Sequence, residues 1–261
     1  MLRPWPRQVV HIRERAAITQ LHVARHSHVG SYDRTRQFGD WITQNGECDT
    51  RAVVLIKESL KPVTKSYCCT VSKGRWFSYY NATYYANAYG GVIQIDHTVP
   101  VENVWISGGW RWTKATRVRY YNDLLDPRTL VGVDAYDNES KGDQDPTSWL
   151  PADGQCRYVR YWVAVKIRWH LKVTQAEKTK LASLAASCPN RRMTITKSSA
   201  TDEQAASLGE ARGRQAVGRG RRVSDRPRRN TARAIGRSRG DRQGTGEAVS
   251  QRSRDQSAAS S

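Results

Sequence analysis

Asp96 and His97 stand side by side, directly after the short β-branched segment Val92–Ile95. Adjacent side chains at the end of a strand point to opposite faces, so one can hold a metal ion while the other faces a water molecule. A neutral imidazole can act as a general base near neutral pH. A carboxylate and the amide oxygen of Asn138 suit a hard divalent cation that keeps some of its waters. This combination suits phosphodiester hydrolysis, which needs an activated water, a cation and stabilisation of the leaving oxygen.

An Asp-His pair alone is common, and a histidine after a strand is often a structural residue with satisfied hydrogen bonds. The complete series of motifs in this order is much less common. It runs strand, Asp-His-x-x-Pro, second strand, and then Asn-x-x-Lys-Gly-Asp from Asn138 to Asp143.

Two short strands and a short helix must position these side chains. The patterns predict strands at Val92–Ile95 and Leu130–Val133, and a helix that opens at Asn138–Gly142 and ends before Pro146. Between the strands, helical patterns at 101–105 and 113–123 predict a helical excursion, with Thr113 as N-cap.

The flanking sequence predicts an α+β domain. The expected elements are a helix at Thr50–Leu60, a strand at Cys68–Phe77, and helices at Tyr158–Trp169 and Thr174–Cys188, where Thr174 and Glu177 form a capping box. The Trp-rich stripe of the last two helices is expected in the core. Trp105, Trp110 and Trp112 either stack on unpaired bases or pack the excursion against the body, and we expect packing.

The charge of the chain indicates an anionic partner. Net charge is +19 over 261 residues, which favours nucleic acid or an anionic surface and disfavours a polycationic substrate. No window reaches about 18 consecutive apolar residues, so we expect no transmembrane helix. An association with a membrane surface ranks last because the basic tail has no amphipathic apolar face.

Composition divides the chain into three parts: an irregular or disordered segment 1–30, a compact domain 31–189 and a disordered Arg-rich tail 190–261. The tail holds +10 of the net charge and no aromatic residue or cysteine, so it cannot bury enough apolar area to offset its ordering entropy. It is either a polyanion-binding arm or a dispensable solvated tail. In the first segment, His22, His26 and His28 form either a metal-binding tract or a set of scattered solvated side chains.

The ordered motifs of residues 31–188 resemble the HNH-type (ββα-metal) nuclease domain at the C-terminal end of GmrSD-type modification-dependent restriction enzymes. The stand-alone, usually secreted bacterial members are the most similar. The matching stretches are Tyr32-Asp33-Arg34, Phe38-Gly39-x-Trp41, Cys48-Asp49-Thr50-Arg51, Cys69-x-Val71-x-x-Gly74-x-Trp76, Ile95 to Pro100, Trp105-x-Ser107-Gly108, Asn122-Asp123-Leu124, Asn138 to Pro146, Trp149-x-Pro151, Cys156-x-Tyr158 and the helix closing at Cys188.

The resemblance implies roles for five residues. His97 corresponds to the general base, Asp96 to one metal ligand and Asn138 to the second. Lys141 is expected to contact phosphate, with Asp143 in a supporting role. The implied cofactor is a divalent ion, Mg²⁺ or Mn²⁺ first, with Zn²⁺ as a further option.

One position departs from the family pattern. Thr129 stands where the pattern has an asparagine before the second strand. We expect Thr129 to donate a hydrogen bond to the loop or to the backbone of His97, and Asn122 to compensate.

Five cysteines without a Cys-x-x-Cys pair make a zinc knuckle unexpected. Two disulfides are predicted, Cys48–Cys69 and Cys156–Cys188. The spacing in the resembling family favours Cys69 over its neighbour Cys68, which leaves Cys68 free, but the adjacent pair keeps both choices open. Disulfides and the resemblance indicate an extracellular protein. The sequence contains no visible signal peptide, so a cytoplasmic protein is the alternative.

The leading prediction is a metal-dependent endonuclease, acting on DNA in preference to RNA, monomeric and without a membrane partner. An immunity protein is a possible partner that the sequence does not reveal. The alternative is a non-catalytic basic DNA-binding protein on a degenerate nuclease fold.

Overall fold

The computed structural model describes residues 8–44, 46–66 and 69–198. All of them belong to the first of the two units into which the chain divides, residues 1–216, while the second unit is 217–261. Most of the tail predicted to be disordered, residues 199–261, lies outside the described residues.

The described chain is mixed α+β, as predicted. The strands are β1 (Val9–Arg13), β2 (Thr43–Gln44), β3 (Cys48–Asp49), β4 (Thr64–Lys65), β5 (Val71–Ser78), β6 (Thr83–Asn87), β7 (Ile93–His97), β8 (Leu130–Asp134) and β9 (Arg192–Thr196). The helices are α1 (Glu14–Thr19), α2 (Arg34–Phe38), α3 (Thr50–Glu58), α4 (Val101–Ile106), α5 (Lys114–Tyr121), α6 (Ala135–Lys141), α7 (Gln155–Arg168) and α8 (Gln175–Ala186), with short 3₁₀ turns η1 (Tyr89–Gly91) and η2 (Gly109–Arg111).

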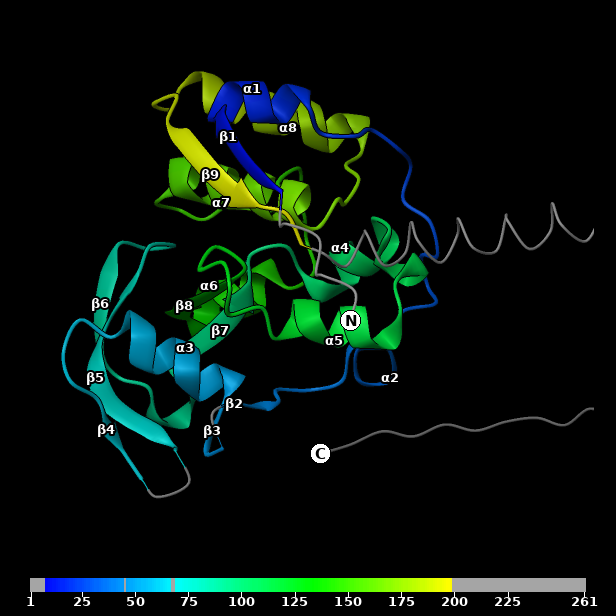
Figure 1. Cartoon of the computed structure of the whole chain (residues 1–261). Helices are drawn as coiled ribbons and strands as arrows, with labels where there is room; N and C mark the ends of the chain where they lie inside the picture. The colour runs from blue at the N-terminus through cyan, green and yellow to red at the C-terminus, as the bar shows by residue number, and fades with distance from the viewer. Residues whose placement is uncertain (1–7, 45, 67–68, 199–261) are drawn as a thin grey trace, which may run out of the picture. The chain divides into compact units, whose positions relative to one another are not determined.

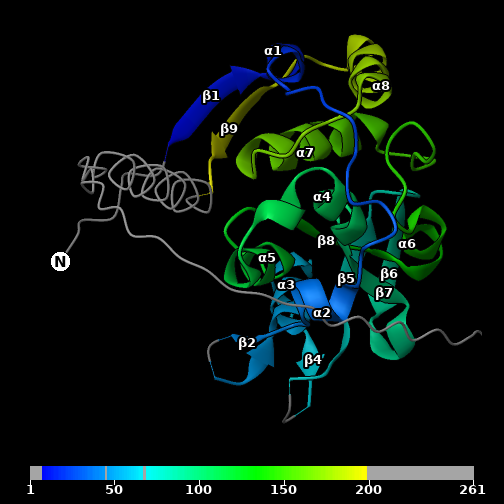
Figure 2. The same cartoon turned by 90° about the vertical axis from the view of Figure 1, so that its right-hand side faces the viewer.

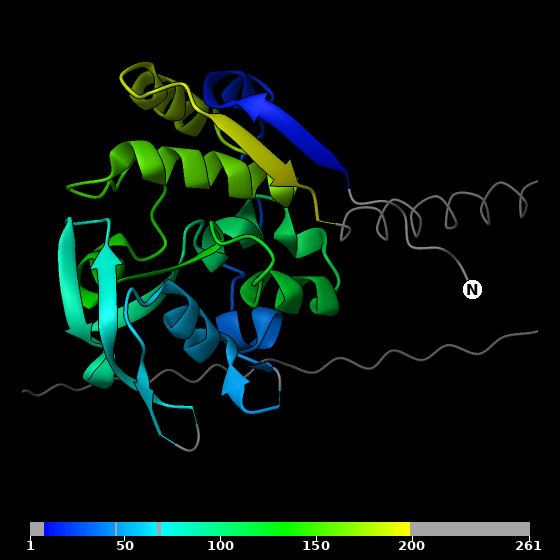
Figure 3. The ribbon, with the colours of Figure 1, turned by 60° about the vertical axis from the view of Figure 1, so that its left-hand side comes forward.

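The strands of the described residues form four small sheets. Their strand orders are β1-β9, β2-β3, β4-β5-β6 and β7-β8, and every pair is antiparallel. The sheet β4-β5-β6 lies beside α3 (Figure 3), and α1, α7 and α8 gather around the β1-β9 ribbon (Figure 1).

The predicted strand–strand–helix unit is present. β7 and β8 pair with Asp96 opposite Val131 and His97 opposite Leu130, and α6 follows β8 directly and packs against both strands. The excursion between the strands is helical, as expected: it forms α4, η2 and α5, which lie beside α2 (Figure 2).

Local signals explain the predicted helices. Thr113 accepts the N-capping hydrogen bond of α5, and Thr174 and Glu177 form the capping box of α8. Trp162 and Trp169 of the stripe are buried, as predicted. Trp105 and Trp112 are buried and Trp110 packs against the main core, so packing is also confirmed for the excursion.

The first segment differs from the prediction. Residues 9–19 form β1 and α1 instead of irregular chain, and Ala17, Ile18 and Leu21 lie in the main core. Residues 192–196, assigned to the disordered tail, form β9. The reason is that β1 and β9 stabilise each other across more than 170 residues of sequence, a pairing that no local pattern reveals.

Both predicted disulfides are present. Cys48 joins Cys69 with a Cα–Cα distance of 5.1 Å, and Cys156 joins Cys188 at 5.5 Å. Cys68 lies outside the described residues. No helix within residues 8–198 that the structure describes is long and apolar enough to cross a membrane.

Candidate active site

His97 ends β7 in an aromatic enclosure. The Trp41 ring stacks on its imidazole with ring centroids 5.3 Å apart and planes 2° apart. His97 Nε2 lies 2.9 Å from the Tyr121 carbonyl oxygen at the end of α5. A carbonyl accepts only, so Nε2 carries the proton and donates, which leaves Nδ1 as the acceptor nitrogen. Among the described residues, Nδ1 has no hydrogen-bond partner.

His97 is held neutral. Burial lowers the pKa of His97 to about 3, and the nearby charges of Arg34 and Lys141 act in the same direction. The hydrogen bond to the Tyr121 carbonyl only partly opposes this effect. The imidazole is therefore neutral throughout the physiological pH range, with its lone pair on Nδ1.

Asp96 occupies the preceding position of β7 and points to different partners. Its Oδ1 accepts from Lys141 Nζ at 2.8 Å and its Oδ2 from the Tyr80 hydroxyl at 2.5 Å. Burial raises the pKa of Asp96 and lowers that of Lys141, because both charged forms lose water, and their mutual attraction opposes both shifts. Asp96 and His97 therefore contact different groups, although both contribute to the wall of one cavity.

Lys141 differs from its predicted role. Its side chain is fully buried, and its ammonium donates to Asp96 Oδ1 and to the His97 carbonyl oxygen at 3.1 Å. A phosphate in solvent cannot reach this group in the structure. Lys141 is the last residue of α6, and its side chain points toward β7. The sequence Lys-Gly-Asp alone does not indicate whether the lysine is buried or exposed.

A cavity of about 400 Å³ lies between β7, α6 and the start of α4. Four of the predicted residues contribute to its wall: Asp96, His97, Asn138 and Asp143. The other lining residues are Tyr32, Arg34, Gln94, Ile95, Pro100, Val101, Glu102, Glu139 and Gly142. The structure thus brings the proposed base and both proposed metal ligands to one cavity.

Polar side chains at the α6 side of the cavity form a short chain. Asn138 Nδ2 donates to Gln94 Oε1 at 2.5 Å, and Gln94 Nε2 donates to Glu139 Oε1 at 2.7 Å. These contacts fix the amide of Asn138 through its nitrogen, so its carbonyl oxygen remains the ligand atom.

Two carboxylates of the cavity wall, those of Glu102 and Asp143, lie next to each other. The pKa of Glu102 is raised by burial and by the adjacent Asp143, which shares a hydrogen bond with it. Two neighbouring carboxylates repel each other when both are ionised, and a cation relieves that repulsion. A proton shared between Glu102 and Asp143 relieves the same repulsion.

Asn122 and Thr129 lie outside the cavity wall. Asn122 Oδ1 accepts from Ile42 N and from the Thr50 hydroxyl, and its Nδ2 donates to the Asp40 and Val118 carbonyls. Asn122 thereby anchors the end of α5, whose Tyr121 carbonyl orients His97.

Thr129 supports the same loop from the other side. Its hydroxyl donates to Asp123 Oδ2 at 2.9 Å, and its carbonyl accepts from Thr98 N at 3.0 Å. Asp123 is also bound by Arg168 through two hydrogen bonds of 2.8 and 2.9 Å and by Trp169 Nε1. The expected bond from Thr129 to the loop is present, and the excursion is held by a buried, fully paired ion network.

Several residues of the site were not predicted as functional. Tyr80, Trp41, Glu102 and Arg34 contact Asp96, His97 or the cavity. Arg34 is exposed, lines the cavity and donates to the Tyr121 hydroxyl. Arg34 and Trp41 belong to stretches of the family resemblance, but nothing in their own spacing assigns them a role.

The described chain is thus an α+β domain with two disulfides. Its candidate site is the cavity that contains His97, beside the unit formed by β7, β8 and α6.

Comparison with known proteins gives one relationship. Over 159 residues the chain is 39% identical to a protein of Arthroderma benhamiae described as "Uncharacterized secreted protein", and the match spans 60% of this chain and 76% of that protein. The chain belongs to the family of that protein. No family model matches the sequence, and no solved structure matches it.

Proposed function

We propose that this protein is a metal-dependent endonuclease that hydrolyses nucleic acid, DNA in preference to RNA, with His97 as general base. The observation that carries the proposal is the cavity in which a buried neutral imidazole, with its Nδ1 unpartnered among the described residues, lies with Asp143, Glu102 and the Asn138 amide. The net charge of +19 supports a polyanionic substrate.

Glu102, Asp143 and the carbonyl oxygen of Asn138 would hold the ion. Asp96 contributes to the wall but already balances Lys141, so its predicted role as a ligand is the weaker one. When bound, a divalent ion supplies positive charge that neutralises phosphate oxygens.

The protein's own side chains account for the rest of the chemistry. His97 takes a proton from water at Nδ1 while Nε2–H stays on the Tyr121 carbonyl, so the ring keeps its orientation. Arg34, with a guanidinium that can bind two oxygens of one phosphate, takes the phosphate contact that the sequence assigned to Lys141.

The location proposed for the protein is extracellular. Two disulfides and the secreted relative support it, because disulfides persist in oxidising compartments.

The activity is tested by incubating the protein with plasmid DNA or single-stranded RNA, each with Mg²⁺, Mn²⁺ or Zn²⁺, and measuring cleavage. The wild type should nick or cut plasmid with at least one of these ions and stop when EDTA is added. His97→Ala should lower cutting by about a hundredfold or more, whereas His22→Ala, a change at an exposed histidine, should leave it unchanged. Circular dichroism confirms folding of both variants. Equal cutting by His97→Ala and the wild type would reject the role of His97.

One observation favours the alternative of a non-catalytic DNA-binding protein. The Asp96–Lys141 pair is internally neutral, as expected for a structural ion pair. That alternative predicts salt-dependent DNA binding, unaffected by EDTA, with no cleavage under any of the ions.

A further inference from the structure

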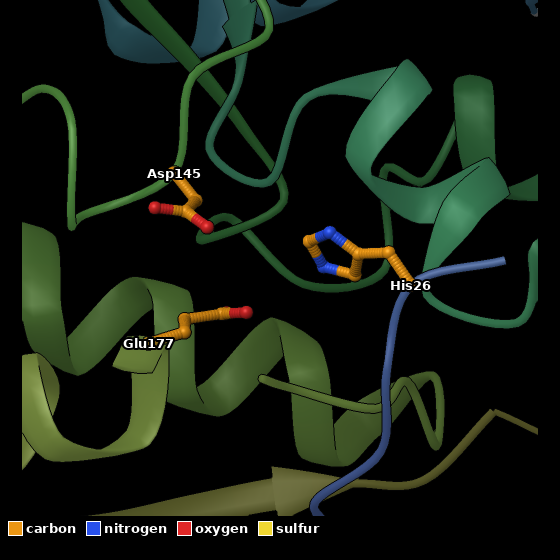
Figure 4. A group of neighbouring side chains, drawn as sticks. All are labelled: His26, Asp145 and Glu177. Carbon is orange, nitrogen blue, oxygen red and sulfur yellow. The ribbon is translucent and has the colours of Figure 1, made fainter. Parts of the chain in front are cut away.

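A second group of ligand-type side chains lies outside the candidate active site. His26, Asp145 and Glu177 come from three separate segments: the chain after α1, the loop between α6 and α7, and the first turn of α8 (Figure 4). Each offers one ligand atom, and the three atoms lie within 4.8 Å of one another.

His26 carries the strongest sign of a missing partner. Its Nε2 is buried and has no hydrogen-bond partner among the described residues. An unpaired buried polar nitrogen costs free energy, so such groups usually have a partner. Burial lowers the pKa of His26 and the nearby Lys166 acts in the same direction, while Glu177 and Asp145 oppose the shift. A neutral ring has a lone pair to donate.

The backbone holds His26 in place on both sides. Val173 N donates to the His22 carbonyl, Ala24 N donates to the Val173 carbonyl, and Ser27 N donates to the Ile106 carbonyl. The imidazole is therefore presented by an anchored segment, which lowers the ordering cost of binding a ligand.

The carboxylates keep capacity for a further bond. Asp145 Oδ1 accepts from Thr147, and no bond to its Oδ2 is found in the described part of the chain. Glu177 is fully buried. Its Oε1 accepts from Trp162 Nε1 at 2.6 Å and its Oε2 from Thr174 N at 3.4 Å, so each oxygen keeps one further lone pair.

Lys166 is the cation already present beside Glu177, at 3.3 Å from Oε1. The same ammonium has three nearer acceptors: Asn103 Oδ1 at 2.6 Å, Ser107 Oγ at 2.9 Å and the Lys172 carbonyl at 3.0 Å. It can therefore remain bound when Glu177 turns to another cation.

We propose that His26, Asp145 and Glu177 bind one divalent transition-metal ion of the Zn²⁺ type. Imidazole nitrogen and carboxylate oxygen both bind Zn²⁺, and an open zinc site has three protein ligands with a water as the fourth. Bonds of about 2.0–2.2 Å place tetrahedral ligands about 3.4 Å apart, so the three atoms close by at most about 1.4 Å. The bound ion ties the N-terminal segment and the loop after α6 to α8. This site is separate from the His97 cavity and does not depend on the proposed function.

Metal analysis of the full-length protein after loading with Zn²⁺ and gel filtration tests the site. The wild type and the control His28→Ala should each retain the same amount, with His26→Ala lower by about one equivalent. Co²⁺ should give visible absorption bands in the wild type that weaken in His26→Ala. Zn²⁺ should also raise the Tm of the wild type more than that of His26→Ala.

The variant Asp143→Asn distinguishes this site from the candidate active site. It should retain the one equivalent of Zn²⁺ that His26→Ala loses. Asp145→Asn is the second variant of the site and, because Asp145 is half-exposed, is expected to fold. Retention of all bound Zn²⁺ by both His26→Ala and Asp145→Asn would overturn the proposal, as would a wild type that binds no Zn²⁺.

Discussion

His97 combines two properties that a surface histidine lacks. Its ring is enclosed by Trp41 and Tyr121, and its Nε2–H is fixed on a backbone carbonyl. The first property keeps the ring neutral and the second fixes its tautomer. A residue with both presents one lone-pair nitrogen, Nδ1, at a defined position.

Lowering the pH should destabilise the protein through His97. Burial lowers the pKa of His97 to about 3 in the folded chain, whereas an imidazole in the unfolded chain titrates near about 6.5. Between these values the unfolded state binds a proton and the folded state does not. Stability is therefore complete above about pH 6.5 and falls by about 1.4 kcal/mol per pH unit below it.

Urea unfolding at pH 7 and at pH 5 measures this effect. The wild type should lose about 2 kcal/mol more than His97→Gln, which keeps an N–H donor and does not titrate. His22→Gln, at an exposed position, should behave like the wild type. Equal losses for His97→Gln and the wild type would contradict the burial of a neutral ring.

Lys141 should prove important for stability. Lys141→Met removes the partner of the buried Asp96 carboxylate, so the free energy of unfolding should fall by about 3–5 kcal/mol. The double variant Asp96→Asn/Lys141→Met removes both charges and should recover most of that loss, as measured by urea unfolding. A double variant as unstable as Lys141→Met would show that packing, not the unpaired charge, explains the loss.

At the scale of elements, the β1-β9 ribbon connects the two ends of the described chain. Met193 and Ile195 of β9 are buried, and Thr196 O accepts a hydrogen bond from Arg168. A chain that ends at Asn190 should therefore be about 3–6 kcal/mol less stable to urea than one that ends at Ser198. Equal stabilities would mean that β9 adds little to the core.

The local elements were predictable because their signals are local. Thr113 and the Thr174–Glu177 pair cap helices within one turn, and the aromatic spacing of α7 matches the helical period. The β1-β9 pairing was not predictable, because its two strands are more than 170 residues apart in sequence and no local pattern links them.

The candidate site was also predictable only in part. Asp96, His97, Asn138 and Asp143 meet at one cavity, since β7 and α6 lie side by side in the strand–strand–helix unit. The inward direction of Lys141 and the supporting contacts of Asn122 depend on tertiary packing. No pattern around His26 connects it to Asp145 and Glu177, which lie more than a hundred residues away.

At the scale of the whole molecule, an arginine-rich segment lies apart in sequence from the candidate site. Residues 199–261 carry fourteen arginines and seven acidic residues, whereas the candidate site lies within residues 32–143. If the arginines serve as an arm for a polyanion, they contribute to affinity and not to the chemical step.

Comparison of the full chain with a chain ending at Ser198 separates these contributions. DNA binding by fluorescence anisotropy across a series of salt concentrations should be weaker for the shorter chain, with a shallower salt dependence. If four of the fourteen arginines contact phosphates, the log–log slope becomes shallower by about 3.6. Cutting at saturating DNA should be the same for both chains, because His97 and its cavity are retained. An unchanged slope would show that the arginines do not contact DNA, and loss of cutting at saturation would place part of the catalytic machinery beyond Ser198.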